Sequence, residues 1–146
     1  MPAKRKSRGE LSIRESRHKE IFQIVRRAQR SATDYVIARY KKKEYPKGYE
    51  VDEVCRAVIT DAGYGKYFTH RTGHNIYTKD HGPGAHVDSL ETRDFRTLIP
   101  RTCFSIEPGI YLPGEFGIRL EYDLVSINAD TVRITGGVQE EVKTLF

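Results

Sequence analysis

Side chains able to bind a metal ion gather in the second half of this 146-residue chain. Three histidines fall within twelve positions, and two glutamates follow on short segments bounded by glycine. These residues are His70, His74, His81, Glu107 and Glu121. Imidazole nitrogens beside carboxylate oxygens suit divalent ions such as Mn, Co, Fe and Zn. The set predicts a hydrolytic metal centre. Composition and spacing alone leave open the alternative of histidines with no chemical role.

Alternation along a strand sorts residues 117–124 into two faces. One face is apolar, and the other carries only charged residues, namely Arg119, Glu121 and Asp123. In the preceding strand Ser105 and Glu107 share a face, and Pro108 follows at once and interrupts the strand. A charged face in the middle of a strand requires either solvent or a bound group, and the second explanation agrees with a metal centre.

Length and composition indicate one globular domain, with 38% apolar and 31% charged residues. No apolar run approaches the ~20 residues that cross a bilayer, and the charged N-terminus lacks the hydrophobic stretch of a secretory signal. Cys55 and Cys103 stand alone without a CxxC pair, so we expect reduced thiols. From these features we expect a cytoplasmic protein without membrane association.

The net charge of +5 arises largely from basic clusters near residues 4–8, 26–30 and 41–43. We expect these clusters to form a solvated tail and an exposed helix face. Attraction to nucleic acid or to a ribosome surface is a second possibility, although no basic motif with interleaved aromatic residues supports it.

Two helices are predicted before the strands begin. Residues 1–11 form a flexible basic arm, helices cover residues 12–40 and about 50–62, and Gly63 ends the second helix. Apolar residues at spacings of three and four predict the buried faces, which comprise Ile13, Phe22, Val25, Ala28, Ala32, Tyr35 and Val36, then Val51, Val54, Cys55, Val58 and Ile59.

The hydrophobic period changes to that of strands after Gly65. Short strands are predicted at 67–70 and 75–77 around a turn at Gly73, and longer ones at 103–112, 117–127 and 131–135. Residues 78–99 are predicted to form a long loop with a short helical turn near Leu90. Two helices followed by a mostly antiparallel curved sheet make an α+β fold.

Four ordered motifs carry a resemblance to a known family. They are GYGKYFTHRTGH (63–74), DHGPG (80–84), CFSIEPGIYLP (103–113) and FGIRLEYD (116–123). With these motifs the chain resembles the metallopeptidases that include aminopeptidase P, prolidase, methionine aminopeptidase and creatinase, whose fold is the pita-bread fold. The resemblance implies that residues 12–146 form half to most of that fold, as a domain lacking its N-terminal half.

The resemblance also implies a role for each matching residue. His74, Glu107 and Glu121 correspond to metal ligands, with Glu121 bridging two ions and Glu107 also acting as general base. His70 and His81 correspond to the histidines that contact substrate and stabilise the tetrahedral intermediate. Arg119 corresponds to the arginine that supports the bridging glutamate.

Two departures from the family pattern qualify this expectation. The glycine-rich stretch after the metal-binding histidine is replaced by residues 75–77, Asn-Ile-Tyr. The two aspartate ligands that family members supply from strands before the first helix have no counterpart, because Asp34 and Asp52 fall within predicted helices. We therefore expect one divalent ion (Mn, Co or Zn) rather than two.

The expected substrate is a peptide cleaved at an N-terminal or Xaa-Pro bond. The expected partner is a second copy of the chain, or another polypeptide that supplies the missing half. A non-catalytic module that binds peptides, ribosomes or nucleic acid, and a truncated fragment, are the alternatives.

Overall fold

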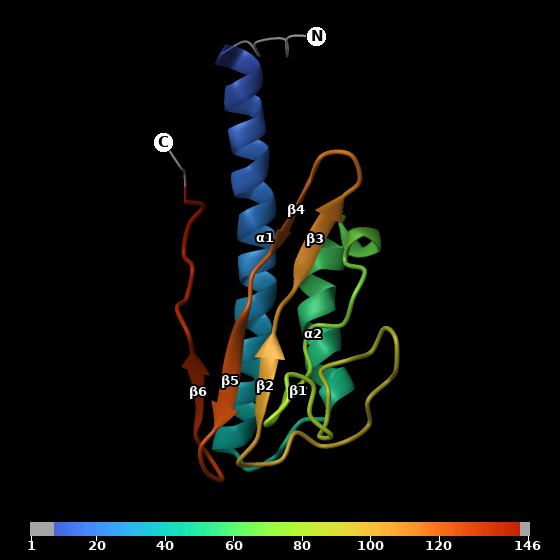
Figure 1. Ribbon diagram of the computed structural model, residues 1–146, viewed down its shortest axis with the longest axis vertical. Coiled ribbons are helices and arrows are strands. Elements are labelled where there is room, and N and C mark those ends of the chain that lie inside the picture. Colours follow the sequence, from blue (N-terminus) through green and yellow to red (C-terminus); the bar gives the residue numbers. More distant parts are fainter. Residues whose placement is uncertain (1–7, 144–146) are drawn as a thin grey trace.

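Two helices followed by strands make up the computed structural model, which describes residues 8–143. Helix α1 (Arg8–Lys41) and helix α2 (Gly48–Asp61) lie side by side and run in opposite directions (Figure 1). The 3₁₀ turn η1 (Gly65–Tyr67) follows α2. The described residues then form β1 (Asn75–Ile76), β2 (Cys103–Ile106), β3 (Gly109–Leu112), β4 (Phe116–Arg119), β5 (Tyr122–Ser126) and β6 (Val132–Thr135). The predicted α+β fold is confirmed.

The helices bury most of the residues that their sequence periodicity predicts, but Tyr35, Val54 and Val58 are only half-buried and Ile13 is exposed. The side chains that become fully buried include Val25, Ala28, Ala32 and Val36 of α1 and Val51, Cys55 and Ile59 of α2. Ile13 is 73% exposed, because the first turns of α1 extend beyond the other elements (Figure 1). Residues 1–7 of the predicted basic arm lie outside the described residues, and α1 begins at Arg8 rather than at Ser12. Gly63 follows α2 with a φ of 91°, a conformation that favours glycine.

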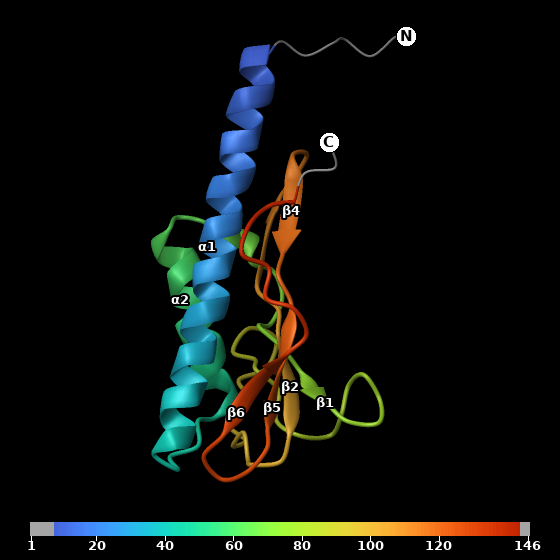
Figure 2. The same ribbon diagram turned by 90° about the vertical axis from the view of Figure 1, so that its left-hand side faces the viewer.

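Antiparallel pairing joins all the strands into two sheets. One sheet has the order β1-β2-β5-β6, and β3 pairs with β4 alone. Both helices lie on the same side of the strands (Figure 2). Polar contacts supplement the apolar core between the layers: the side chain of Gln29 donates to the carbonyl of Ile106 at 3.2 Å, and the hydroxyls of Thr33 and Tyr122 lie 2.6 Å apart.

The two longest predicted strands each divide into two. Glu107-Pro108 separates β2 from β3, and Leu120-Glu121 separates β4 from β5. Ile106 pairs with Tyr122 and Gly109 pairs with Arg119, so the two breaks face each other across the ribbon. Proline has no N–H to donate to a ladder, which explains the break after Glu107. The amide of Leu120 donates to the carbonyl of Pro108 at 3.2 Å and keeps the ribbon closed there.

Two local predictions in the loops are wrong, for identifiable reasons. Residues 67–70 form no strand, because the carbonyls of Phe68 and His70 accept hydrogen bonds from the Arg56 side chain instead of from a neighbouring strand. No helical turn forms at Leu90, because the carbonyl of Asp88 accepts the amide of Asp94 at 3.0 Å instead of the amide of Thr92, as a helix would require. The predicted long loop over residues 78–99 is present (Figure 1).

Neither described helix is both long and apolar enough to cross a bilayer.

Cys55 and Cys103 are free thiols. Burial raises the pKa of Cys55 to about 12, so this thiol is protonated at neutral pH.

Candidate active site

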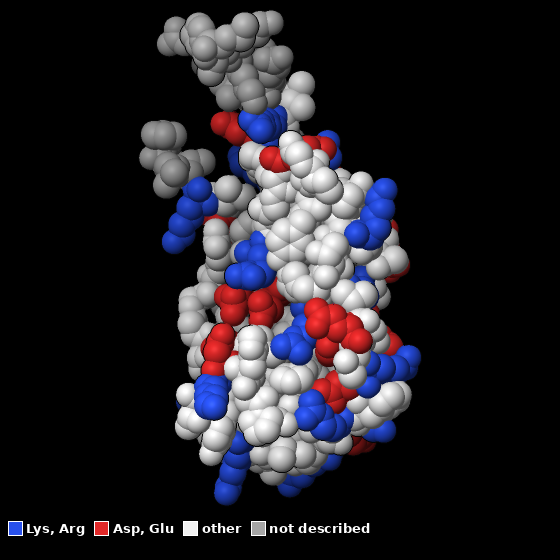
Figure 3. Space-filling view, turned by 45° about the vertical axis from the view of Figure 1, so that its right-hand side comes forward, with Lys and Arg blue, Asp and Glu red and all other residues white. Residues whose placement is uncertain are grey.

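A cavity of about 530 Å³ brings together all six residues that the sequence nominates for chemistry. Its lining includes His70, His74, His81, Glu107, Arg119 and Glu121. These residues come from the loop before β1, the loop after it, and the two facing breaks in the β2–β5 ribbon. Acidic and basic side chains gather in the middle of the face of the molecule that Figure 3 shows. Three further charged residues line the cavity: Arg71, Asp80 and Glu91.

His74 and Glu107 form the tightest pair in the cavity. Nε2 of His74 lies 3.3 Å from Oε1 of Glu107, and both side chains are nearly buried. Nδ1 of His74 lies 3.0 Å from the carbonyl oxygen of Asn75. A carbonyl can only accept, so Nδ1 carries a proton, and Nε2 is the ring nitrogen that faces Glu107. Metal-binding histidines are oriented in this way by a carbonyl behind the ring.

Ser105 connects the members of this pair through its hydroxyl. The amide of His74 donates to Oγ of Ser105 at 3.0 Å, and Oγ donates to Oε1 of Glu107 at 2.8 Å. The amide of Glu107 donates to the carbonyl of Thr72 at 2.7 Å. Ser105 is fully buried, so these bonds form away from water. The Ser105 hydroxyl therefore fixes the histidine and the carboxylate relative to each other.

Arg119 lies between two carboxylates of the facing breaks. Its guanidinium nitrogens are 3.9 Å from Oε2 of Glu107 and 3.7 Å from Oε2 of Glu121. Burial raises the pKa of Glu121, and the charge of Glu107 raises it further, while Arg119 opposes both effects. Burial likewise raises the pKa of Asp123, with His74 opposing and Glu107 adding to the effect. The cavity thus concentrates negative charge, which a cation stabilises.

The donor atoms of His74 and Glu107 fit a shared divalent ion. Two ligands each ~2.1 Å from a tetrahedral ion lie ~3.4 Å apart, close to the 3.3 Å that separates them here. Glu121 lines the same cavity. Among residues 8–143, however, no three His, Cys, Asp or Glu side chains are arranged together as a set of metal ligands. The structure therefore pairs His74 with Glu107 and leaves Glu121 beside Arg119.

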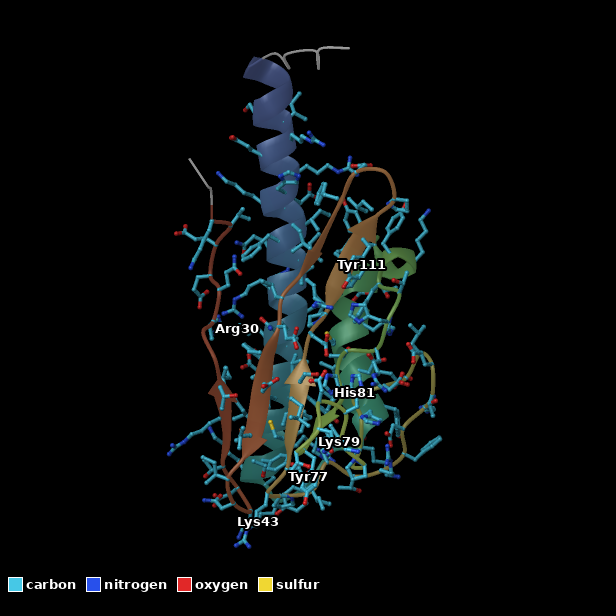
Figure 4. All side chains as sticks on the ribbon, in the orientation of Figure 1. Arg30, Lys43, Tyr77, Lys79, His81 and Tyr111 are labelled. Atoms are coloured by element: carbon cyan, nitrogen blue, oxygen red, sulfur yellow. The ribbon has the colours of Figure 1, made fainter. Side chains whose placement is uncertain are left out.

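The two remaining histidines of the cavity differ in their contacts. His70 Nδ1 lies 2.7 Å from the carbonyl oxygen of Arg71, and Nε2 lies 2.6 Å from the hydroxyl of Tyr111. The first contact places the ring proton on Nδ1, so neutral His70 accepts from Tyr111 at Nε2. The exposed His81 packs edge-on against His74, with ring centroids 4.3 Å apart. Figure 4 shows Tyr111 on β3, above His81.

Sequence reasoning missed three residues that line this cavity and a fourth, Tyr111, that contacts a lining residue. Tyr111 contacts His70 directly, and the period of two from Glu107 was a signal that could have found it. Arg71, Asp80 and Glu91 lie in loops without periodicity, where no signal marks them.

Asn75 ties the loop after β1 to the neighbouring strand. The buried side chain of Asn75 accepts from the amide of Gly84 at 3.2 Å and donates to the carbonyl of Cys103 at 3.4 Å. Its own amide donates to Nδ1 of His86 at 2.9 Å. Burial lowers the pKa of His86, and Arg71 and other charged groups contribute, so His86 stays neutral and able to accept. Asn75 therefore fastens the loop that carries His81 to β1 and β2.

Comparison with known proteins gives a consistent result. The model of metallopeptidase family M24 matches residues 9–127. An Xaa-Pro dipeptidase of Lactobacillus delbrueckii subsp. lactis is 38% identical over 127 residues, which cover 87% of this chain and 32% of that protein.

Solved structures agree with this match. A dipeptidase from Pyrococcus horikoshii OT3 superimposes with a TM-score of 0.72 and 36% identity, over 87% of this chain and 33% of that one. An X-Pro aminopeptidase from Thermotoga maritima MSB8 gives a TM-score of 0.69 and 32% identity, over 84% and 32% respectively. The chain thus spans about a third of the length of these relatives.

Proposed function

Because the chain belongs to metallopeptidase family M24 and shares its pita-bread fold, we propose that the cavity binds one divalent metal ion and serves hydrolysis of a peptide bond. The observation that carries the proposal is the 3.3 Å approach of His74 Nε2 to Glu107 Oε1 in a cavity also lined by Glu121. The donor set suits Mn, Co or Zn. We propose His74, Glu107 and Glu121 as its ligands, with Glu121 turning from Arg119 toward the ion.

The ion, when bound, would lower the pKa of a water molecule and polarise the substrate carbonyl. Glu107 lies where it can accept a proton from water in the cavity, because one of its oxygens is turned toward His74 and the other toward Arg119. His81 is exposed at the cavity and would donate to the developing oxyanion. His70 would contact substrate while Tyr111 sets its orientation.

The proposed substrate is a peptide with an N-terminal or Xaa-Pro bond, since the relatives are an Xaa-Pro dipeptidase and an X-Pro aminopeptidase. Charged residues at the cavity support a small substrate with charged ends. Arg71 can pair with a carboxylate, and Asp80 and Glu91 can pair with an amine.

We also propose that a second polypeptide, either a copy of this chain or a partner, pairs with an exposed edge of the sheet. The two ends of the four-stranded sheet, β1 and β6, are edge strands, and Tyr77 beside β1 is 71% exposed. Edges of this kind invite pairing with another chain. Sedimentation at micromolar concentration tests this association, and a strictly monomeric protein contradicts it.

Calorimetric titration with Mn²⁺, Co²⁺ and Zn²⁺ tests the metal site. We expect binding heat for the native chain and none for the double variant His74→Ala, Glu121→Ala. A matched double variant at positions that do not line the cavity, His18→Ala with Glu115→Ala, should bind as the native chain does. Equal heats from the two double variants would contradict the proposal.

An Xaa-Pro dipeptide assay with the bound ion tests the activity. We expect release of the N-terminal residue, reduced at least ~100-fold by Glu107→Gln. Metal and peptide binding without release would instead support a non-catalytic binding module. Salt-sensitive RNA binding that disappears on removal of residues 1–9 would support the nucleic-acid alternative.

A further inference from the structure

A buried carboxylate on α2 lies outside the set of residues that line the cavity. Asp52 is fully buried. Its Oδ1 accepts hydrogen bonds from the amide of Thr72 at 3.0 Å, the hydroxyl of Thr72 at 2.5 Å and Nη2 of Arg56 at 3.1 Å. Its Oδ2 accepts from Nε of Arg56 at 3.2 Å and the amide of Ser89 at 2.9 Å. One side chain thus gathers donors from a helix and from two loops.

Arg56 continues the same network with its remaining N–H groups. Nη1 donates to the carbonyl of Phe68 at 2.9 Å, and Nη2 donates to the carbonyl of His70 at 2.8 Å. The guanidinium carbon lies 4.0 Å from the centre of the Phe68 ring, a cation–π contact. The loop segment 68–72 is therefore bound to α2 at three successive points, and no strand pairing holds it.

Both loops that this network holds line the cavity. The first carries His70, Arg71 and His74, and the second carries Glu91. The carbonyl of Thr72 also accepts the amide of Glu107, so the network reaches the proposed general base through one residue.

From this arrangement we propose that Asp52 and Arg56 are positioning residues, which set the loop bearing His70 and His74 against Glu107. The proposal rests on the proposed function in one respect only, namely that the positioned groups bind a metal ion.

The energetics of buried ion pairs favour a role in geometry. A buried pair adds little net stability, because removing two charges from water offsets their attraction. The Asp52–Arg56 pair instead joins α2 to three backbone groups of residues 68–72 and to Ser89. Lysine cannot reproduce this, since the planar guanidinium fork binds a carboxylate at two points while donating elsewhere.

Two readouts test the proposal without an activity assay. The first is the NMR signals of the His70 ring, assigned by their loss in His70→Gln, and the second is the affinity for Zn²⁺ by calorimetry. In Asp52→Asn and Arg56→Lys we expect the ring signals to move and the affinity to fall about 10- to 100-fold, as for groups that orient metal ligands.

The matched control lies one residue along the same helix. Glu53 accepts from the Ser89 hydroxyl at 3.0 Å and pairs with Arg93 at 3.3 Å, at the exposed side of the same loop. Glu53→Gln should leave both readouts at native values. A second pair of variants probes the network without altering charge. Thr72→Val, which lacks the hydroxyl, should shift the His70 signals and lower the Zn²⁺ affinity in the same way. Thr72→Ser, which keeps the hydroxyl, should show native values for both.

Folded Asp52→Asn and Arg56→Lys proteins with native His70 signals and native affinity would overturn the proposal. If either variant fails to fold, Thr72→Val decides by the same criteria. If the native chain binds no zinc, the proposed metal site fails, and the His70 signals alone decide whether Asp52 and Arg56 position the loop.

Discussion

The hydroxyl of Tyr111 donates a hydrogen bond of 2.6 Å to Nε2 of His70 and so joins β3 to the loop that follows η1. On its other side the ring donates from Nδ1 to the carbonyl of Arg71. Two partners therefore determine the orientation and tautomer of His70. Tyr111 thereby acts on the cavity through His70, one of the residues that line it.

Tyr111→Phe should release one side of the His70 ring. We expect the Nε2 signal of His70 to shift in NMR spectra, with a loss of about 1 kcal/mol in the free energy of unfolding. Tyr45→Phe removes a hydroxyl that donates to Ala129 at the surface and serves as the control. Identical His70 spectra in both variants would show that Tyr111 does not orient the ring.

Ser105→Ala should separate the proposed metal ligands without touching either of them. The variant leaves the His74 amide without its acceptor and Glu107 Oε1 without a donor. We expect the affinity for Zn²⁺ to fall about 10-fold or more. Ser126→Ala, at a buried serine of β5 on the sheet away from these ligands, is the matched variant and should retain native affinity.

Asp94 should make stability depend on pH at the acid end of the range. Burial alone would raise its pKa, but hydrogen bonds from the Arg96 side chain and from the amides of His86 and Arg96 outweigh burial and lower the pKa to about 2. A carboxyl with a lowered pKa contributes stability above its unfolded pKa, and this contribution disappears as pH falls from about 4 to about 2.

Asp94→Asn should therefore lower the free energy of unfolding by about 2 kcal/mol at pH 7, and the difference from the native chain should shrink as pH falls from about 4 to about 2. Urea unfolding followed across this pH range measures the effect. Asp34→Asn breaks an exposed pair with Arg30 and should change stability by less than about 0.5 kcal/mol. A constant difference at every pH would contradict the assignment to the Asp94 charge.

Gly73→Ala should disturb the contact between the histidine loop and β2. A β-carbon at position 73 would lie 1.8 Å from the carbonyl oxygen of Ser105, so the backbone must move. We expect a loss of about 1–3 kcal/mol in thermal or urea unfolding, as for overpacked sites. At Gly137 a β-carbon meets no atom within 4 Å, and Gly137→Ala should leave stability nearly unchanged.

Periodic segments of the sequence predicted their structure well. Alternation correctly assigned Arg119, Glu121 and Asp123 to one face, because Leu120, Tyr122 and Leu124 are buried on the other. Spacings of three and four located both helices and most of their buried residues. These patterns succeed because each strand or helix buries one face against a single core.

The periodicity of apolar residues could not predict the segments whose backbone is held in place by side chains. Residues 68–72 resemble a strand in composition, yet Arg56 and Asp52 occupy the backbone groups that a strand would pair. Asp80 and Glu91 reach the cavity from a loop whose course depends on capping by Asp88 and Asp94. Such long-range contacts connect residues whose separation follows no period.

The opposed breaks in the β-ribbon bear on how this scaffold tolerates insertions and deletions. Beyond Glu107-Pro108 and Leu120-Glu121, the hairpin formed by β3 and β4 ends in an exposed turn at residues 113–115. Residues added or removed in matched pairs at that tip leave the pairing at Gly109 and Arg119, and hence both glutamates, in place. An unmatched residue between a break and the tip shifts one arm against the other and reverses which side chains face inward. The length of the β3–β4 hairpin can therefore change in steps of matched pairs while Glu107 and Glu121 stay in position.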